Sequence, residues 1–297
     1  MQESYVARME QAIAHKKYFI NIIQAVEDRL TYSNVLESVF QKKSMVSVAI
    51  LDYGCGSGLL TYKLAEAFPG AQIVGYDRSL DMIEIARERF SARNLKFVSD
   101  LRHVKEGHFN YIILSSVLHE VYSHSGMFSS IAQFLNSLKT YLVPRGYIIS
   151  RDNYVADSAG QRPLKVKFVN EKMMTRALGC AEELLKLTPP HLKGHLGRLV
   201  FDKEAKTLFG SERGVKEFLN KLTWGEESMP RESQESLFCL SNTDFKWVTH
   251  SNGVYDHIAS YAYTDTSYLG YLSEYVQFVE YFPTHLWTLL QLKESNT

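Results

Sequence analysis

A glycine-rich turn directly behind a short apolar run is the feature that most constrains the fold of this chain. The apolar run covers residues 48–51, and the turn, DYGCGSG, covers residues 52–58. A short continuous apolar run is typical of a strand that is buried on both faces of a parallel sheet. Glycines at its end let the backbone take positive φ and approach a ligand closely. Leu60, Leu64 and Phe68 then recur at helical spacing, so the segment predicts a strand, a ligand-binding turn and a helix.

The same alternation of apolar runs and helical periodicity continues to residue 150. Further strands are predicted at residues 72–76, 95–98, 111–114 and 147–150. Helical patterns lie around residues 82–90 and 128–142, and Pro144 to Gly146 are expected to separate the last helix from strand five. Strands and helices that alternate at this spacing indicate βαβ units. We therefore predict an α/β fold with a Rossmann-like, doubly wound and mostly parallel sheet.

The rest of the chain is expected to cover or complete this sheet. Residues 1–45 carry apolar residues at helical spacing and are predicted to form an N-terminal helical cover. Residues 46–152 are the predicted core with the ligand site. Residues 153–244 leave the alternation and predict a mainly helical insert or lid after strand five. Residues 245–297 are expected to complete the core with strands and a helix. The strand-like segments in this last part are residues 245–248 and 286–292.

Composition narrows the class of protein. The chain has 33 basic and 33 acidic residues, whereas a dedicated nucleic-acid binder usually has a basic excess. The three cysteines lack metal-ligand spacing, so no metal site is expected. Because their number is odd and they lie far apart in the sequence, a disulfide framework is not expected either, and reduced thiols are predicted. No apolar run approaches the roughly 20 residues that span a bilayer. These features, with no recognisable signal peptide, predict a soluble, cytoplasmic protein without membrane contact.

The details of the turn favour a ligand with an amino-acid moiety over a dinucleotide. The dinucleotide fingerprint has glycine at its first, third and sixth positions. Here the sixth position is Leu59, and the third glycine comes one residue early, at Gly58. Asp52 precedes the turn, where its carboxylate would repel a pyrophosphate but would help to hold an ammonium group.

Two further carboxylates follow the next two predicted strands. Asp77 is placed to accept the hydroxyl hydrogens of a ribose, although a helix N-cap is the alternative. Asp100 is placed to accept from an adenine amino group, with a solvated turn residue as the alternative. The carboxyl ends of parallel strands share one edge of the sheet. Asp52, Asp77 and Asp100 therefore match the amine, ribose and adenine of S-adenosylmethionine (SAM).

With these features, residues 46–152 resemble the class I SAM-dependent methyltransferase family. The matching stretches are LDYGCGSG at 51–58, VGYDRSLDMIEIAR at 74–87, VSD at 98–100 and LVPRGYIISRD at 142–152. The resemblance implies an enzyme that uses SAM as its cofactor. It implies SAM contacts at Asp52, Gly54, Gly56, Gly58, Asp77, Met82, Asp100 and Leu101, and the predicted cofactor site also includes Cys55, Arg78 and Ser115. Asn110 departs from the family, which often has Asp there, and a structural role is expected for it. Two further stretches, SSVLHEVYS at 115–123 and TWGEES at 223–228, resemble uncharacterised bacterial and phage methyltransferases.

Candidate acceptor residues follow strands four and five. His119 and Glu120 come after strand four, where the acceptor is expected to meet the methyl group. They are the candidate catalytic residues, as general base or as orienting group, and a helix-start pair in polar contacts is the alternative. Tyr122, Arg151 and Asp152 are candidate substrate-binding residues. An ion pair that closes the sheet edge is the other interpretation of the last two.

Two other groups of residues have a structural and a binding interpretation. The tyrosines between residues 255 and 281 are suited to stacking on planar substrates or to packing, and packing is favoured. In the predicted lid, the positive charges are offset by nearby acids, so a solvated surface is favoured over a nucleic-acid patch. The positive charges are Lys165, Lys167, Lys172 and Arg176, and the acids are Glu171, Glu182 and Glu183.

The function predicted from the sequence is methyl transfer from SAM to an oxygen or nitrogen atom of a small-molecule acceptor. Transfer from a sulfonium is an in-line displacement that needs no metal, so the protein mainly supplies alignment and a dry site. Methylation of RNA or DNA is the alternative within enzymes, and a SAM-binding protein without catalysis is the alternative outside them. The sequence carries no prediction of the acceptor's identity or of the oligomeric state.

Overall fold

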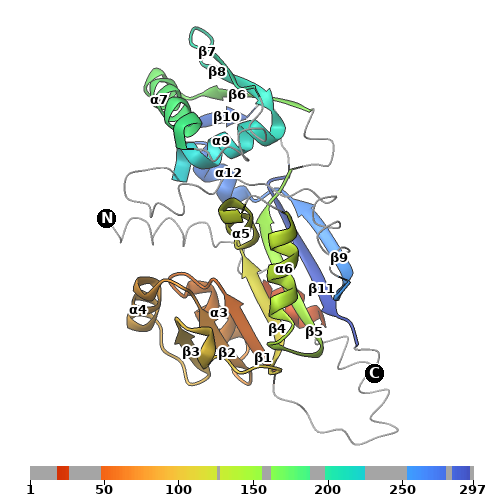
Figure 1. Cartoon of the computed structure of the whole chain (residues 1–297). Helices are drawn as coiled ribbons and strands as arrows, with labels where there is room; N and C mark the ends of the chain where they lie inside the picture. The colour runs from red at the N-terminus through yellow and green to blue at the C-terminus, as the bar shows by residue number, and fades with distance from the viewer. Residues whose placement is uncertain are drawn as a thin grey trace, which may run out of the picture. The chain divides into compact units, whose positions relative to one another are not determined.

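Figure 1 labels the helices and strands in a computed structural model of the chain. The chain divides into two compact units. The first unit comprises Met9–Ser115, Leu138–Ile149 and Leu289–Thr297, and the second comprises Met1–Arg8, Ser116–Ser137 and Ser150–Thr288. These units cut across the four segments predicted from the sequence. The structure describes residues 19–26, 48–125, 128–155, 162–187, 198–224, 253–278 and 283–294.

The first unit contains four parallel strands. They are β1 (Ala49–Tyr53), β2 (Gln72–Tyr76), β3 (Leu95–Val98) and β4 (Phe109–Ser115). β1 pairs with β2 on one side and with β4 on the other, and β2 pairs with β3. The order of the whole sheet is β3-β2-β1-β4-β5-β11-β9, where β5 is Leu142–Asn153, β9 is Tyr255–Tyr263 and β11 is His285–Leu292. The chain therefore winds outward in one direction, returns to the centre and winds the other way, which confirms the predicted doubly wound α/β fold.

Two helices of the first unit follow the signals in the sequence. α3 (Leu59–Ala67) starts after Gly58 and buries Leu60 and Leu64, and it ends at Phe68, next to a proline. α4 (Leu80–Arg89) starts at Ser79, whose side chain accepts from the backbone of Met82 at 3.4 Å. Such a cap satisfies one of the free N–H groups at a helix start. Residues 19–26 are also helical, so the described part of the predicted N-terminal cover has the expected structure.

The second unit contains α5 (Leu118–Ser125), most of α6 (Phe128–Leu138) and a separate antiparallel sheet. The strands of this sheet lie in the order β10-β6-β8-β7. Their bounds are Pro163–Phe168 for β6, Val200–Asp202 for β7, Thr207–Ser211 for β8 and Val276–Phe278 for β10. The helices of this part are α7 (Glu171–Leu187), α9 (Glu212–Trp224) and α12 (Thr266–Leu272).

Two details of the secondary structure differ from the prediction. The segment 153–244 has the expected helices, but it also supplies the strands β6, β7 and β8. Strand five begins at Leu142 rather than at residue 147, so Pro144 lies inside β5 and does not separate it from a helix. Arg145 takes φ of 60° at this point, which shows that the strand is locally irregular. The strand predicted at residues 245–248 lies outside the described residues. Within the described part of the chain, no helix combines the length and the apolar character needed to cross a membrane.

Candidate functional site

The register of the parallel strands brings the predicted cofactor residues to one edge of the first unit. Tyr53 stands beside Tyr76 on one neighbouring strand and beside Leu114 on the other, and Tyr76 stands beside Val98. The residues that follow this row therefore leave the same edge of the sheet. They are Gly54, Asp77, Ser99 and Ser115. The strand order reverses between β1 and β4, and open α/β sheets bind ligands outside the carboxyl ends of strands at such a point.

The glycine turn is held in one conformation. Gly54, Gly56 and Gly58 have φ of 77°, 51° and 83°. The backbone N–H groups of Gly54 and Cys55 donate to the carbonyl of Tyr76 at 2.7 and 2.9 Å. A Cβ atom at Gly58 would lie 2.7 Å from Ala86 Cβ and 2.7 Å from the ring of Phe97. The turn therefore needs glycine at position 58 for its conformation and for space.

Asp77 connects this turn to the start of α4. Its Oδ2 accepts from the backbone of Gly56 at 2.8 Å, and its Oδ1 accepts from the backbone of Ser79 at 2.9 Å. The N-cap of α4 is Ser79, so the helix-cap interpretation of Asp77 does not describe its position. Its carboxylate instead fixes the glycine turn at the edge where the ligand is expected.

Asp52 is a buried carboxylate with one unused oxygen. It is 1% exposed, and its Oδ2 accepts from Thr61 Oγ1 at 2.7 Å. Among the described residues its Oδ1 has no hydrogen-bond partner. Burial raises the pKa of Asp52 to about 7, aided by the charge of Asp77 and opposed by the Thr61 hydrogen bond. A buried polar atom without a partner is costly, so Oδ1 fits a donor supplied by a ligand.

Thr61 was not found from the sequence. It is fully buried on α3, between the apolar positions Leu60 and Leu64. A polar residue on the apolar side of a helix, one turn after the glycine turn, was the available signal.

Three other predicted cofactor residues differ in what they can present. Cys55 is buried in a cluster with Ile83, Ala86 and Phe97, and its thiol donates to the carbonyl of Gly56 within the turn at 3.8 Å. Burial raises the pKa of the Cys55 thiol well above its usual range, which keeps it neutral. Arg78 is exposed, and Met82 is half-buried in the first turn of α4.

Asp100 accepts hydrogen bonds from Arg102, which is not among the residues predicted for the site. It caps the short helix η2 (Leu101–His103) by accepting from the backbone of Arg102 at 2.8 Å. Its Oδ2 also accepts from the Nε and Nη2 atoms of Arg102 at 2.8 and 2.5 Å. These hydrogen bonds lower the pKa of Asp100 to about 2, so this carboxylate stays ionised at neutral pH.

Leu101 and Ser115 are half-buried. Asn110, in β4, accepts from the backbone of Ala49 at 2.9 Å, which agrees with the structural role expected for it.

In the second unit, Asp152 fixes the ring of His119 and the start of α5. Its Oδ2 accepts from the backbone of Leu118 at 2.8 Å, and its Oδ1 lies 2.6 Å from His119 Nδ1. The other ring nitrogen of His119, Nε2, lies 3.5 Å from Glu120 Oε1. Burial lowers the pKa of His119, but the carboxylates of Asp152 and Glu120 outweigh this effect and raise it to about 10. A positively charged ring at neutral pH favours an orienting or hydrogen-bond-donating role over that of a base.

Arg151 lies at the centre of a second buried network. Its Nη2 lies 2.8 Å from Asp265 Oδ2, and both side chains are at most 6% exposed. Its Nε donates to the hydroxyl of Tyr263 at 3.0 Å, and its Nη1 donates to Ser116 Oγ at 3.2 Å. Ser116 has φ of 58°, so the guanidinium holds a strained residue at the start of the segment that leads to α5. The ion pair of Arg151 is with Asp265 and not with its sequence neighbour Asp152. Tyr122 is buried on α5.

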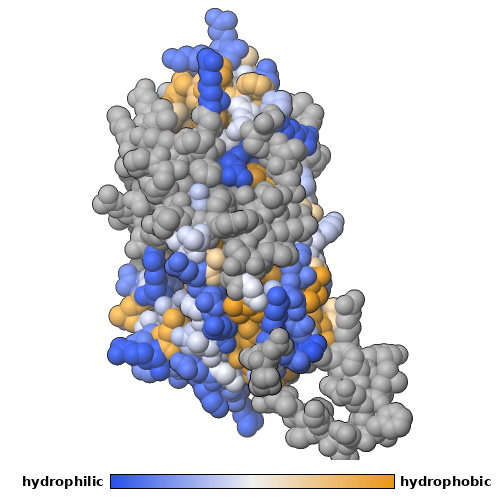
Figure 2. Space-filling model, turned by 45° about the vertical axis from the view of Figure 1, so that its right-hand side comes forward, coloured by the Kyte–Doolittle hydropathy of each residue, from blue (hydrophilic) through white to orange (hydrophobic). Residues whose placement is uncertain are grey.

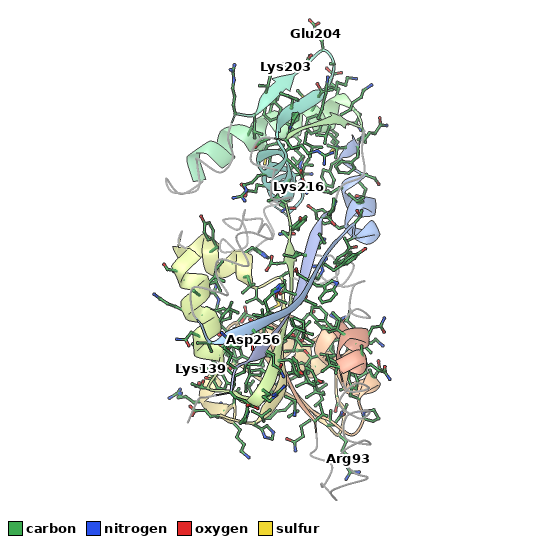
Figure 3. The ribbon with its side chains drawn as sticks, turned by 90° about the vertical axis from the view of Figure 1, so that its right-hand side faces the viewer. Arg93, Lys139, Lys203, Glu204, Lys216 and Asp256 are labelled. Carbon is green, nitrogen blue, oxygen red and sulfur yellow. The ribbon has the colours of Figure 1, made fainter. Side chains whose placement is uncertain are left out.

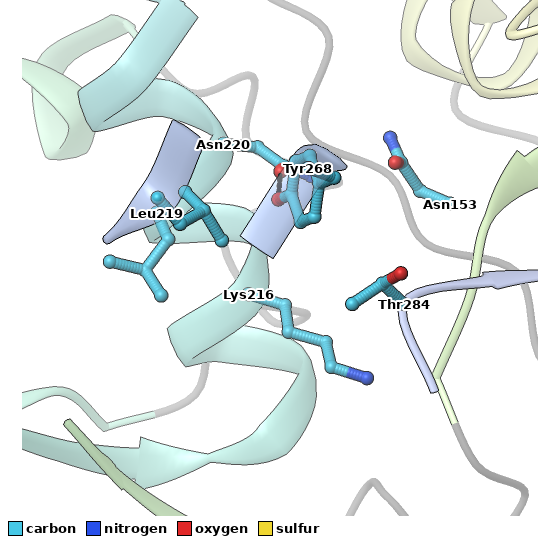
Figure 4. Close-up of a pocket in the computed structure, with 7 residues that line it drawn as sticks. Asn153, Lys216, Leu219, Asn220, Tyr268 and Thr284 are labelled. Atoms are coloured by element: carbon cyan, nitrogen blue, oxygen red, sulfur yellow. Dashed lines mark hydrogen bonds between the residues drawn. The ribbon is translucent and has the colours of Figure 1, made fainter. Parts of the chain in front are cut away.

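A small pocket in the second unit adjoins the His119–Asp152 pair (Figure 4). The backbone of Asn153, which lines it, donates to Asp152 Oδ1 at 2.9 Å. Lys216 Nζ donates to Glu212 Oε1 at 2.5 Å, to the carbonyl of Pro283 at 2.8 Å and to that of Tyr154 at 3.1 Å. These bonds use all three donors of the ammonium group, so Lys216 is structural here. The lining residues are Asn153, Lys216, Leu219, Asn220, Tyr268, Leu272 and Thr284.

A family model described as a methyltransferase domain matches residues 45–204, which is more than half of the chain. The chain belongs to this methyltransferase family. It is a class I, SAM-dependent methyltransferase enzyme, as the resemblance implied.

Two curated relatives and one solved structure illustrate the similarity. The malonyl-[acyl-carrier protein] O-methyltransferase of Acetivibrio thermocellus is 27% identical over 198 residues, which cover 64% of this chain and 68% of that protein. Its counterpart from Bacillus cytotoxicus is 31% identical over 108 residues, which cover 36% of this chain and only 33% of that protein. The crystal structure of a SAM-dependent methyltransferase from Mesorhizobium loti aligns with a TM-score of 0.48 and 16% identity, over 84% of this chain and 93% of that one.

The cofactor of this methyltransferase is SAM, and the edge of the first unit fits it. The buried Asp52 offers an oxygen that is unpartnered among the described residues to a ligand that carries an ammonium group. Asp77 holds the glycine turn that follows β1 in place by accepting from the backbone of Gly56. The turn, the strand order and the two acids are therefore all consistent with a SAM site at this edge of the sheet.

Most of the described tyrosines near the C-terminus of the methyltransferase pack or hold structure. Tyr255 is buried and donates to the carbonyl of Leu135 at 2.8 Å. Tyr263 accepts from Arg151, the hydroxyl of Tyr268 donates to Asn220 (Figure 4), and Tyr275 belongs to a hydrophobic core. Tyr261 is 60% exposed. The side chain of Tyr271 and all of Tyr281 lie outside the described residues.

Proposed function

We propose that this methyltransferase transfers the methyl group of SAM to an oxygen or nitrogen atom of a small-molecule acceptor. The observation that carries the proposal is the buried carboxylate of Asp52, with one oxygen held by Thr61 and the other without a partner among the described residues. The names of the relatives support an oxygen acceptor, because the first two are O-methyltransferases.

Each acid at the edge of the first unit has a proposed part of SAM to bind. Asp52 takes the ammonium group, because a charged donor removes the cost of its buried oxygen. Asp77 takes the ribose hydroxyls, and Asp100 takes the adenine amino group. SAM approaches the backbone of the turn closely, because the turn has glycine at positions 54, 56 and 58 and presents the backbone of Cys55. The side chains proposed to surround SAM are those of Arg78, Met82, Leu101 and Ser115.

SAM supplies an electrophilic methyl group on a sulfonium. The residues of the chain hold it, align it and keep water away, since an in-line displacement depends chiefly on positioning. These roles follow from an edge whose turn is fixed by hydrogen bonds.

On the acceptor side, His119 binds as a protonated donor, and Asp152 orients it through Nδ1. Because this ring is charged at neutral pH, it is a poor base. An acceptor whose oxygen is already ionised, such as a carboxylate, needs no base, since ordinary carboxyl groups have pKa near 4. Glu120, Tyr122 and Arg151 shape the same segment.

The enzyme is proposed to act in the cytoplasm, since its three cysteines are odd in number and far apart in the sequence, which makes a disulfide framework a poor fit. This use of cysteine is typical of a reducing compartment.

The test is transfer of a labelled methyl group. The purified chain is incubated with methyl-labelled SAM and either the small-molecule or the nucleic-acid fraction of a cell lysate. Label in the methyl ester of a carboxylic acid, or in another methylated small molecule, is the expected result. Label found only in nucleic acid would show that the acceptor is RNA or DNA and not a small molecule. SAM binding without any labelled product would show a SAM-binding protein without catalysis. Asp52→Asn is the negative control.

A further inference from the structure

The smaller sheet of the second unit has a complete β-α-β-β-α-β topology. Its elements occur along the chain in the order β6, α7, β7, β8, α9 and β10, with β9 and α12 inserted between α9 and β10. The sheet order is β10-β6-β8-β7. All three strand pairs are antiparallel. This is a split βαβ arrangement, in which both helices lie on one face of a four-stranded sheet.

The helical face of this sheet is a hydrophobic core. Val166, Phe168 and Leu208 point from the strands into a cluster with Met174 of α7 and Phe218 of α9. Because successive side chains of a strand alternate between faces, the residues between these core positions lie on the opposite face. We call this second surface the open face. Its exposed residues include Lys165, Lys167, Val200, Asp202, Phe209 and Gln277, and the buried Thr207 lies between Lys167 and Asp202 on the same face.

An aromatic ring lies in the middle of the open face. Phe209 is on the central strand β8 and is 45% exposed. In the register of the sheet it stands beside Lys165 of β6 on one side and Val200 of β7 on the other. Lys167 is two residues further along β6. Figure 2 shows hydrophobic and hydrophilic residues side by side at the top of the picture, the end where Figure 1 places β7 and β8.

The structure separates charges that lie close together in the sequence. Lys165 and Lys167 belong to the open face, whereas Glu171 and Lys172 belong to α7, on the helical side. Asp202 is the one acid among the residues of the open face named above. Lys203 and Glu204, at the turn between β7 and β8, lie at its tip and have opposite charges (Figure 3). The open face therefore combines a positive charge with an exposed ring.

We propose that the open face binds single-stranded nucleic acid, with Phe209 stacked on a base and Lys165 and Lys167 at phosphates. Four-stranded sheets with exposed aromatic rings bind unpaired bases in this way, and lysines supply the phosphate contacts. A protein partner is less well matched, since stable protein interfaces bury about 1,200 Å² or more and the large apolar side chains here are Phe209 and Val200. This binding goes beyond methyl transfer and does not depend on which acceptor is methylated.

The test measures fluorescence anisotropy of labelled oligo-U and oligo-dT of about 12 nucleotides with the full chain, at about 50 mM salt. Wild-type protein is expected to bind in the micromolar range. Phe209→Ala weakens binding about 5-fold or more, whereas Phe209→Tyr retains it, because stacking needs the ring. The slope of log K against log salt is negative, and the double variant Lys165→Ala, Lys167→Ala makes it less steep by about 1.4, or about 0.7 for each phosphate that a lysine no longer neutralises. Lys172→Ala, on the helical side, is the matched control and leaves binding unchanged.

Three results overturn the proposal. One is a wild-type affinity no greater than that of Phe209→Ala, with circular dichroism showing that both are folded. Another is an equal loss in Lys172→Ala and in the double variant, which places the binding elsewhere. The third is tighter binding to polyglutamate than to either oligonucleotide, which makes the open face a surface for an acidic protein.

Discussion

Thr61 Oγ1 donates a 2.7 Å hydrogen bond to one oxygen of Asp52, and the other oxygen of that carboxylate has no partner within the described residues. The group is 1% exposed. Its position at the end of β1, next to the glycine turn, makes it the most specific feature of the proposed SAM site.

Replacing Asp52 with asparagine is expected to weaken SAM binding about 10-fold or more, because hydrogen bonds to charged groups commonly contribute about 1.5–3 kcal/mol. Asparagine keeps the size of the side chain, so the fold is retained. Isothermal titration calorimetry checks the affinity, with Glu88→Gln on the exposed side of α4 as the control. If Asp52→Asn binds SAM with unchanged affinity, the ammonium group of SAM does not bind to this carboxylate.

The protonation of His119 predicts a pH dependence of stability. Its pKa in the folded protein is raised from 6.5 to about 10, so folding is favoured fully below pH 6.5 and this contribution is lost as the pH rises to about 10. Wild-type protein should lose stability across this range more steeply than Asp152→Asn, which lacks the carboxylate at His119 Nδ1. Urea unfolding at several pH values measures the difference. An NMR titration that finds the His119 ring deprotonating near 6.5 would contradict the account.

Two glycines of the first unit make a matched pair. Gly58→Ala places a Cβ atom 2.7 Å from Ala86 Cβ at a residue with φ of 83°, so we expect about 2–4 kcal/mol of destabilisation. Gly70→Ala meets no atom within 4 Å and should change stability by less than about 0.5 kcal/mol. Denaturant unfolding of both variants provides the comparison. Equal stabilities would show that the turn is not constrained as described.

Two ion pairs differ in burial and should differ in effect. Asp265→Asn leaves the Arg151 guanidinium buried without its charged partner and should cost about 3–5 kcal/mol. Glu294→Gln disrupts a pair with Arg145 whose side chains are 62% and 67% exposed, and it should cost less than about 1 kcal/mol. Thermal unfolding of both variants tests the order. A larger effect at the exposed pair would contradict the buried network.

Local patterns were sufficient for the core of the fold. β2 and β3 have the bounds expected from their apolar runs. β1 begins one residue later and ends two residues later than expected, and β4 is longer than expected at both ends. β6 was missed although Lys165 and Lys167 alternate with the buried Val166 and Phe168, which is the period of a strand with one solvated face. The lysines were interpreted through their charge instead of their spacing.

That the candidate cofactor residues share one edge of the sheet was predictable, because they follow strands that the sequence reveals. The networks around Arg151 and the pocket were not, because their partners are distant in the chain. Asp265 lies 114 residues from Arg151, and Asn220 and Tyr268 come from different helices. No local pattern links such residues. The roles of His119, Glu120 and Tyr122 in the reaction remain predictions.

Calorimetric titration of the wild-type chain with SAM tests the central claim most directly. The account predicts saturable binding at one site, competition by the demethylated product S-adenosylhomocysteine, and no binding of a pyridine dinucleotide. Uptake of the dinucleotide by the folded chain, with no heat from SAM or its product, would contradict it.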